Sequence, residues 1–182
     1  MSTPHSRDLR LLAGAAGVSA LGDFMAVFPL ILHVQQRTGS ALAVSALIFA
    51  LWGPVVLAAG LAGMIVDRFE NRALLAIVSL GQAAVVAAMV FATDELWALL
   101  PLMSLLGLGV AVTQPAEFAL VPAAAGETGA ARANGLMETV RSLGFTAGPL
   151  LGGLLGAAGL LQLALVIDAL SFAAVGDRKS VV

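Results

Sequence analysis

The chain has few charged residues: only 11% of its 182 residues are Asp, Glu, Lys or Arg, whereas 60% are hydrophobic and the mean hydropathy is +1.01. An average soluble domain carries roughly 25% charged residues, so this composition could not cover the surface of a water-soluble fold. The charges are clustered, and the apolar stretches between them have the length of about 20 residues that a helix needs to cross a bilayer. The sequence therefore predicts an all-α membrane protein whose main partner is the lipid bilayer.

Further absences exclude several classes of function. Cysteine is missing, which excludes disulfides and thiolate metal sites. The net charge is only -2 and no run of Lys or Arg is present, so we expect no nucleic-acid partner. His5 and His33 are isolated, and no phosphate loop or nucleophile–base pair can be found. We therefore predict no metal site, no cofactor and no enzymatic activity.

Hydropathy and helix breakers predict six membrane spans that together form one bundle over residues 1–176. The predicted spans lie near 11–32, 41–66, 73–92, 96–121, 134–157 and 160–176. The polar start, Met1 to Arg10, is short, and the apolar run after it continues beyond signal-peptide length, which favours a retained first helix. Because the connecting segments are short and polar, successive helices must alternate in direction.

The distribution of basic residues predicts that the N-terminus is cytoplasmic, because Lys and Arg are retained on that side. With this orientation only Arg37 lies in an outer loop. The inner segments hold Arg7, Arg10, Arg68, Arg72, Arg132, Arg178 and Lys179.

A charge cluster follows the second span, in Gly63-Met64-Ile65-Val66-Asp67-Arg68-Phe69-Glu70-Asn71-Arg72. It resembles the signature Gly-x-Leu-x-Asp-Arg-x-Gly-Arg-Lys of the major facilitator superfamily, and the matching positions are Gly63, Asp67, Arg68 and Arg72. Glu70 and Asn71 depart from the signature. The resemblance implies a cytoplasmic gating segment in which Asp67 stabilises the outward-facing state. The alternative is an inner loop that is merely basic.

The fifth predicted span carries a ladder of glycines: Gly135, Gly144, Gly148, Pro149, Gly152 and Gly153. Their spacing resembles the fifth-helix signature of antiporters in the same superfamily. Residues 144, 148, 152 and 156 share one helix face, which permits close backbone packing, and Pro149 invites a kink. The resemblance implies that this face packs against the other half of the transporter and seals it against leak. The alternative is a tight helix crossing without a role in transport.

Four ionisable residues inside the predicted spans are candidates for proton coupling or for the substrate cavity: Asp23, Glu138, Arg141 and Asp168. Glu138 and Arg141 are three residues apart, so we expect them to form an ion pair. In the alternative, Arg141 releases Glu138 and binds Asp23 or an anionic substrate. Asp23 is the first choice for a protonatable carboxyl, because burial favours its neutral form, although a Gly-Asp pair also occurs as a structural feature.

Helix four departs from the drug–proton antiporters of the superfamily, which carry Arg-x-x-Gln-Gly-x-Gly there. Aligned on Gly107 and Gly109, this chain has Met103 in place of the arginine. We interpret Gln114-Pro115-Ala116-Glu117 as a kink with a capping carboxylate. In the sixth span, the sequence around Asp168 resembles the bacterial macrolide-efflux and enterobactin-exporter branch.

Major facilitators have two six-helix halves, so the resemblance implies that this chain is the N-terminal half and that a C-terminal half is missing. Residues 177–182 match the translation of a sequencing adapter, and we interpret them as a non-native tail; a native basic tail is the alternative. The predicted function is proton-driven efflux of a small amphipathic or siderophore-like compound across a bacterial inner membrane. A scaffold or sensor without transport activity is the alternative.

Overall fold

The computed structural model describes residues 4–125 and 129–179, and these residues form helices joined by short turns. Six helices account for the described chain: α1 (Pro4–Thr38), α2 (Ala41–Arg68), α3 (Asn71–Ala92), α4 (Leu96–Ala125), α5 (Ala130–Ala157) and α6 (Leu161–Lys179). The prediction of an all-α fold with six helices is therefore confirmed.

Four of the described helices are long and apolar enough to cross a membrane by themselves. These segments are Ala13–Thr38, Ala41–Arg68, Asn71–Ala92 and Leu96–Pro122. The apolar part of α6, Leu161–Gly176, is shorter. Helix α5 is not among these four segments, and it carries the charged residues Arg132, Glu138 and Arg141. The protein is thus a multi-pass membrane protein whose fifth helix is polar for a membrane span.

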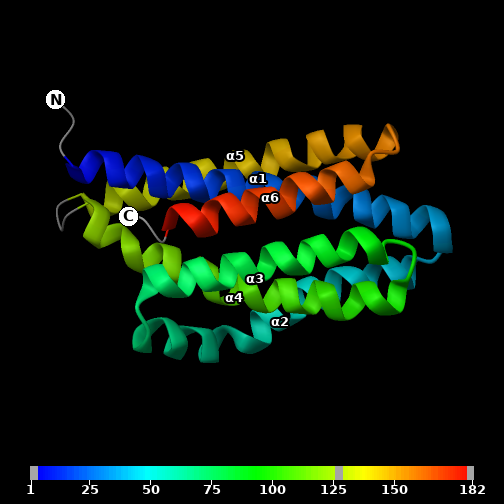
Figure 1. The fold of residues 1–182 in the computed structure, drawn as a ribbon, viewed down its shortest axis with the longest axis horizontal. Coiled ribbons are helices and arrows are strands. Elements are labelled where there is room, and N and C mark those ends of the chain that lie inside the picture. Colours follow the sequence, from blue (N-terminus) through cyan, green and yellow to red (C-terminus); the bar gives the residue numbers. More distant parts are fainter. Residues whose placement is uncertain (1–3, 126–128, 180–182) are drawn as a thin grey trace.

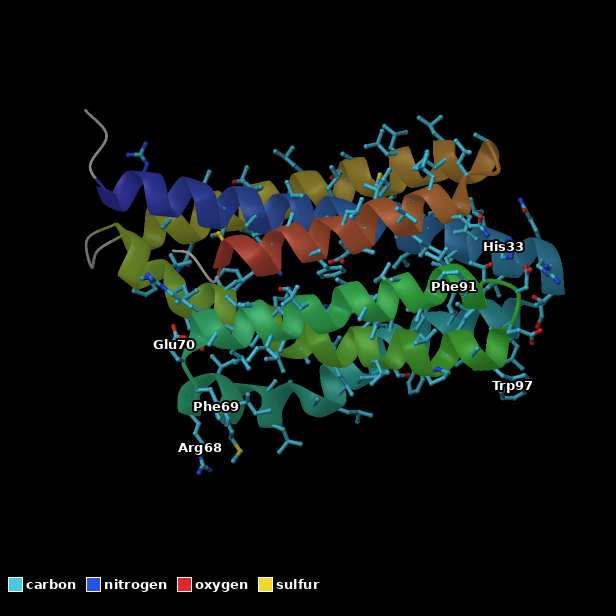
Figure 2. The ribbon with its side chains drawn as sticks, in the orientation of Figure 1. His33, Arg68, Phe69, Glu70, Phe91 and Trp97 are labelled. Atoms are coloured by element: carbon cyan, nitrogen blue, oxygen red, sulfur yellow. The ribbon has the colours of Figure 1, made fainter. Side chains whose placement is uncertain are left out.

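Consecutive helices run in opposite directions, so the turns gather at two ends of the bundle (Figure 1). Figure 2 places Arg68, Phe69 and Glu70 at one end and His33, Phe91 and Trp97 at the other. The turn between α1 and α2 is set by Gly39, whose φ of 59° favours glycine, and by Ser40, whose hydroxyl accepts a hydrogen bond from the Ala43 amide at 3.3 Å. Local chemistry therefore ends one helix and begins the next.

The helices pack as two groups of three with matching contacts. In one group α1 packs against α5 and α6, and in the other α4 packs against α2 and α3. Figure 1 shows the first group as one layer and the second as the layer beside it. The groups meet where α3 packs against α6 and α1 against α4. The main helix pairs are therefore unchanged when each helix is replaced by the one three places along the chain, α1 by α4, α5 by α2 and α6 by α3.

Glu70 is the N-cap of α3, a role that the sequence analysis did not predict. Its carboxylate oxygens accept hydrogen bonds from the backbone amides of Arg72 at 3.2 Å and Ala73 at 2.8 Å. The first amides of a helix have no partner within the helix, so a carboxylate there stabilises both the hydrogen bonds and the helix dipole. The residue that departs from the superfamily signature thus has a structural function.

We expect Glu70→Ala to lower the stability of the complete protein by about 1 kcal/mol, because two backbone amides lose their acceptor. The measurement is the temperature at which the detergent-solubilised protein loses its monodisperse elution peak. Glu70→Gln is the matched variant, because its amide oxygen still accepts a hydrogen bond, and it should lose less. Equal stability of Glu70→Ala and the unmodified protein would contradict the cap.

Candidate functional site: a cavity between four helices

A cavity of about 390 Å³ lies between α1, α2, α4 and α5. Its lining includes the aromatic side chains of Phe24, Trp52 and Phe145, together with aliphatic residues from α1, α2 and α4. Phe24 and Phe145 contact each other edge to face, with ring centroids 4.7 Å apart. The charged residues of the lining are Asp23, Glu138 and Arg141. The cavity therefore combines a large apolar and aromatic surface with a few charged groups, as ligand sites commonly do.

Arg141 pairs with Glu117 of α4 rather than with Glu138. Its Nη2 lies 3.7 Å from Oε2 of Glu117, and its guanidinium carbon is 5.5 Å from the centre of the Phe118 ring. Glu138, one turn away on the same helix, is exposed and lines the cavity. The expected ion pair between Glu138 and Arg141 is therefore wrong: α4 brings a buried carboxylate to Arg141, and a buried pair is screened less than an exposed one.

Asp23 is the candidate that the structure places best for a role in the cavity. Its side chain lines the cavity, and its Oδ1 is buried without a hydrogen-bond partner in the described chain. Glu117 and Arg141 both act on it electrostatically, the first by repulsion and the second by attraction. One nitrogen of Arg141, Nη1, is also buried without a hydrogen-bond partner among the described residues. Asp23 and Arg141 therefore line the cavity together, and Glu117 lies beside Arg141 outside the lining.

Asp168 is separate from the cavity lining and is 1% exposed. It lies on α6, and its carboxylate reaches α1 at Gly22, where an added Cβ would be 2.5 Å from Oδ1. The hydroxyl of Ser171 donates a hydrogen bond to the Asp168 carbonyl oxygen at 2.8 Å and lies 3.4 Å from Oδ1. Asp23 and Asp168 interact electrostatically. Asp23 thus lies near both Arg141 and Asp168, while Glu138 is an exposed residue of the cavity lining.

Glu117 is the functional candidate that the sequence interpretation missed. It was expected to cap a kink, but it lies inside α4 and is only 5% exposed. The sequence feature that could have identified Glu117 is its position near the inner end of an otherwise apolar helix, because a carboxylate there needs a cation nearby. The cation comes from α5, a helix that is distant in sequence.

The glycine ladder faces α1 of the same bundle. An added Cβ at Gly144 would lie 2.9 Å from the Leu21 nitrogen, at Gly148 2.6 Å from the Phe24 Cβ, and at Gly152 2.6 Å from the Met25 carbonyl oxygen. Gly156 continues the same face against Pro29. The expectation that this face packs against the other half is therefore wrong for Gly144, Gly148 and Gly152, because the backbone of α1 already occupies it.

Two other glycines of the predicted signature lie in open space. Nothing lies within 4 Å of an added Cβ at Gly135 or at Gly153, and Leu150 and Leu154 beside Gly153 are 68% and 63% exposed. Pro149 lies inside α5, which remains helical through it. The tight face of α5 and its open face are thus distinct, and only the open face is available to a further partner.

The segment between α2 and α3 lies at the end of the bundle opposite His33 (Figure 2). Asp67 and Arg68 are exposed, and an added Cβ at Gly63 would meet nothing within 4 Å. Arg72 is also exposed and interacts within the chain. At the opposite end, Asp94 pairs with both His33 and Arg37, which joins α1 to the turn between α3 and α4. The predicted gating residues therefore form an exposed surface in this structure.

The model of the family described as Major Facilitator Superfamily matches residues 12–176. The chain belongs to this superfamily. It is 26% identical over 169 residues to the uncharacterized MFS-type transporter YfiS of Bacillus subtilis, covering 92% of this chain and 40% of that protein. No solved structure matches the chain. Membership places the chain in a superfamily of membrane transporters rather than of enzymes.

The fold agrees with that membership. Each half of a major facilitator contains two repeats of three helices in opposite orientation. Here the repeats are α1–α3 and α4–α6, because replacing each helix by the one three places along the chain reproduces the main helix pairs, so each three-helix group described above combines helices of both repeats. Transporters of this kind hold substrates and coupling ions near the middle of the membrane, between the repeats. The cavity here is lined by the first two helices of each repeat, α1 with α2 and α4 with α5.

Proposed function

We propose that the complete protein is a secondary transporter that exports a small amphipathic compound in exchange for protons. The observation that carries the proposal is the cavity, whose lining combines aromatic side chains with Asp23 and with Arg141, the partner of the buried Glu117. An apolar and aromatic wall binds the apolar part of a ligand, and Asp23 is a carboxyl that can gain and lose a proton as the cavity opens to either side.

Arg141 is the group that would couple the proton to the substrate. In the proposed cycle the guanidinium interacts with Glu117 and the Phe118 ring while Asp23 is neutral, and the separations of 3.7 Å and 5.5 Å support this contact. When Asp23 loses its proton, the new negative charge attracts Arg141, and Nη1 is available for that interaction because it has no hydrogen-bond partner in the described chain. If Arg141 exchanged its partner Glu117 on α4 for Asp23 on α1, α5 would move relative to both helices.

Alternating access requires a second half, and we propose that six further helices complete the cavity. The chain spans 40% of the length of its Bacillus relative. The open face of α5 around Gly153 and the exposed apolar face of α2, which includes Val56 and Leu57, are the surfaces that such a half would cover. The exposed segment with Asp67 and Arg68 would then meet the second half at the cytoplasmic side.

We further propose that the end with Arg68 and Arg72 faces the cytoplasm of a bacterial cell and that the N-terminus lies on the same side. The basis is the excess of basic residues at that end. Similarity to the macrolide-efflux and enterobactin-exporter branch makes an amphipathic or siderophore-like substrate the first class to test. The assignment of 177–182 as a non-native tail remains a hypothesis, and residues 180–182 lie outside the described residues.

The test is efflux from cells that lack their own drug pumps and express the complete protein. We expect Asp23→Asn to abolish the dependence of substrate export on the proton gradient, because asparagine cannot exchange a proton. Glu95→Gln is the matched control, because Glu95 is an exposed carboxylate outside the cavity. If both variants accumulate as little compound as the unmodified protein, Asp23 is not the coupling residue. If no substrate of this class is exported, a scaffold or sensor becomes the better explanation.

A further inference from the structure

Asp168 is a carboxyl that the proposed transport cycle does not yet use. It is among the most deeply buried polar residues of the described chain, at 1% exposure, and it is absent from the cavity lining. Its carboxylate contacts the backbone of α1 only because residue 22 is glycine: a Cβ there would lie 2.5 Å from Oδ1 of Asp168 and 2.7 Å from the Ser171 hydroxyl. The next residue along α1 is Asp23, which lines the cavity. The Asp168 carboxyl therefore lies against the residue of α1 that directly precedes Asp23.

The described residues supply no cation to Asp168. Among the described residues, Arg141 pairs with Glu117, and both His33 and Arg37 pair with Asp94. The Ser171 hydroxyl has one hydrogen, and the shorter of its two contacts, at 2.8 Å, goes to the backbone carbonyl rather than to the carboxylate. Helix α3, which packs against α6, has Arg72 at its first turn as its single charged residue. The Asp168 carboxylate thus has weak hydrogen-bond support and no countercharge.

The carboxyls buried in this region outnumber the cations beside them. Asp23, Glu117 and Asp168 are carboxyls of α1, α4 and α6, and Arg141 of α5 is the cation beside the first two, while Glu138 is an exposed residue of the cavity lining. Arg141 can balance one carboxylate, and it lies nearest to Glu117. Two adjacent unpaired carboxylates inside a membrane would repel each other and lose the solvation that water gives them. A proton held by one of these two carboxyls relieves both the repulsion and the loss of solvation.

The other three-helix group contains a neutral counterpart of this contact. There Gln82 of α3 lies against Gly109 of α4, where an added Cβ would be 2.6 Å from the Gln82 Cγ. The shift by three places along the chain relates α6 to α3 and α1 to α4. The contact of Asp168 with Gly22 therefore corresponds to the contact of Gln82 with Gly109. A buried amide is therefore tolerated at this kind of position, and only the α1–α6 contact has a group that can exchange a proton.

We propose that Asp168 is a second proton-binding residue, which exchanges a proton with Asp23 across the side-chain-free contact at Gly22. In this exchange the Asp168 O–H bond breaks as an O–H bond to the Asp23 carboxylate forms, so that Asp168 becomes the carboxylate and Asp23 the acid. Asp168 would hold the proton behind α1, away from the substrate, while the cavity changes its accessible side. This proposal deepens the proposed function: the use of the Asp168 proton in transport rests on that function, whereas proton binding by Asp168 does not.

The test is infrared difference spectroscopy of the complete protein in lipid vesicles, recorded on a change of pH without substrate or gradient. We expect two carbonyl signals from protonated carboxyls, of which Asp168→Asn loses one and Asp23→Asn the other. Gly22→Ala should shift the Asp168 signal, because the new methyl group displaces the carboxyl. Gly14→Ala is the matched control on the same helix, because an added Cβ there meets nothing within 4 Å, and it should leave both signals unchanged.

An Asp168→Asn spectrum that retains both signals would overturn the proposal, and so would an Asp168 signal that is the same at all pH values. If Asp168→Asn does not fold, labelling of the unmodified protein with dicyclohexylcarbodiimide replaces it, because this reagent attacks protonated carboxyls in apolar surroundings. A label on the peptide with Asp168 supports the proposal, and its absence there overturns it. Because neither measurement involves export, a failure of the efflux test would leave their outcome unaffected.

Discussion

Replacement of Gly148 by leucine is expected to prevent α1 and α5 from packing and to leave little folded protein. Even a single Cβ at this position would lie 2.6 Å from the Phe24 Cβ, 3.1 Å from the Leu21 carbonyl oxygen and 3.2 Å from the Met25 nitrogen. Two of these neighbours are backbone atoms, which cannot move without shifting α1 as a whole. Overpacking of this kind costs about 1–3 kcal/mol for small additions, and leucine adds three further carbons, so we expect at least about 3 kcal/mol.

The matched control is Gly153→Leu, five residues along the same helix. An added Cβ at Gly153 meets nothing within 4 Å in the described chain, so the α1–α5 contact should tolerate leucine there. The measurement is the yield and thermal stability of the complete protein in detergent. Similar losses for the two variants would show that the ladder does not act through α1. Loss of transport by Gly153→Leu with normal stability would instead indicate that the open face of α5 contacts the second half.

The second large effect is expected from Arg141→Met, which leaves the buried Glu117 carboxylate without its guanidinium. Glu117 is 5% exposed, and removal of one partner of a buried ion pair costs about 3–5 kcal/mol because the remaining charge is poorly solvated. The Phe118 ring also loses its cation contact. We expect a large fall in thermal stability, measured in detergent on the complete protein, together with loss of proton-dependent export.

Two further variants separate the ion pair from other effects of the substitution. Arg141→Met combined with Glu117→Gln should recover most of the stability, because no unpaired charge remains, but it should not recover export. Arg132→Met removes an exposed arginine from the same helix and should change stability by less than about 0.5 kcal/mol. A double variant as unstable as Arg141→Met would mean that Glu117 is not the partner that matters.

The sequence by itself determined the membrane class, the number of helices and the superfamily. These properties depend on local information: the length of apolar runs, the breakers between them and motifs at fixed spacing. The cavity residue Asp23 could also be found, because a carboxylate in the middle of an apolar helix stands out in any sequence. The caps were only partly predictable, since Glu70 was noticed as a departure from a signature rather than as the acceptor for two helix amides.

Only the tertiary structure decided which residues face each other. Arg141 and Glu138 are neighbours on one helix, yet Arg141 lies beside Glu117, because the rotation of α5 against α4 determines which carboxylate is within reach. The sequence likewise showed that the glycines share one face of α5 but did not show which helix packs against it. In the structure that helix is α1. The sequence specifies what each helix presents at each angle, but the contacts between helices depend on their rotation and depth relative to one another, which arise only when the whole bundle packs.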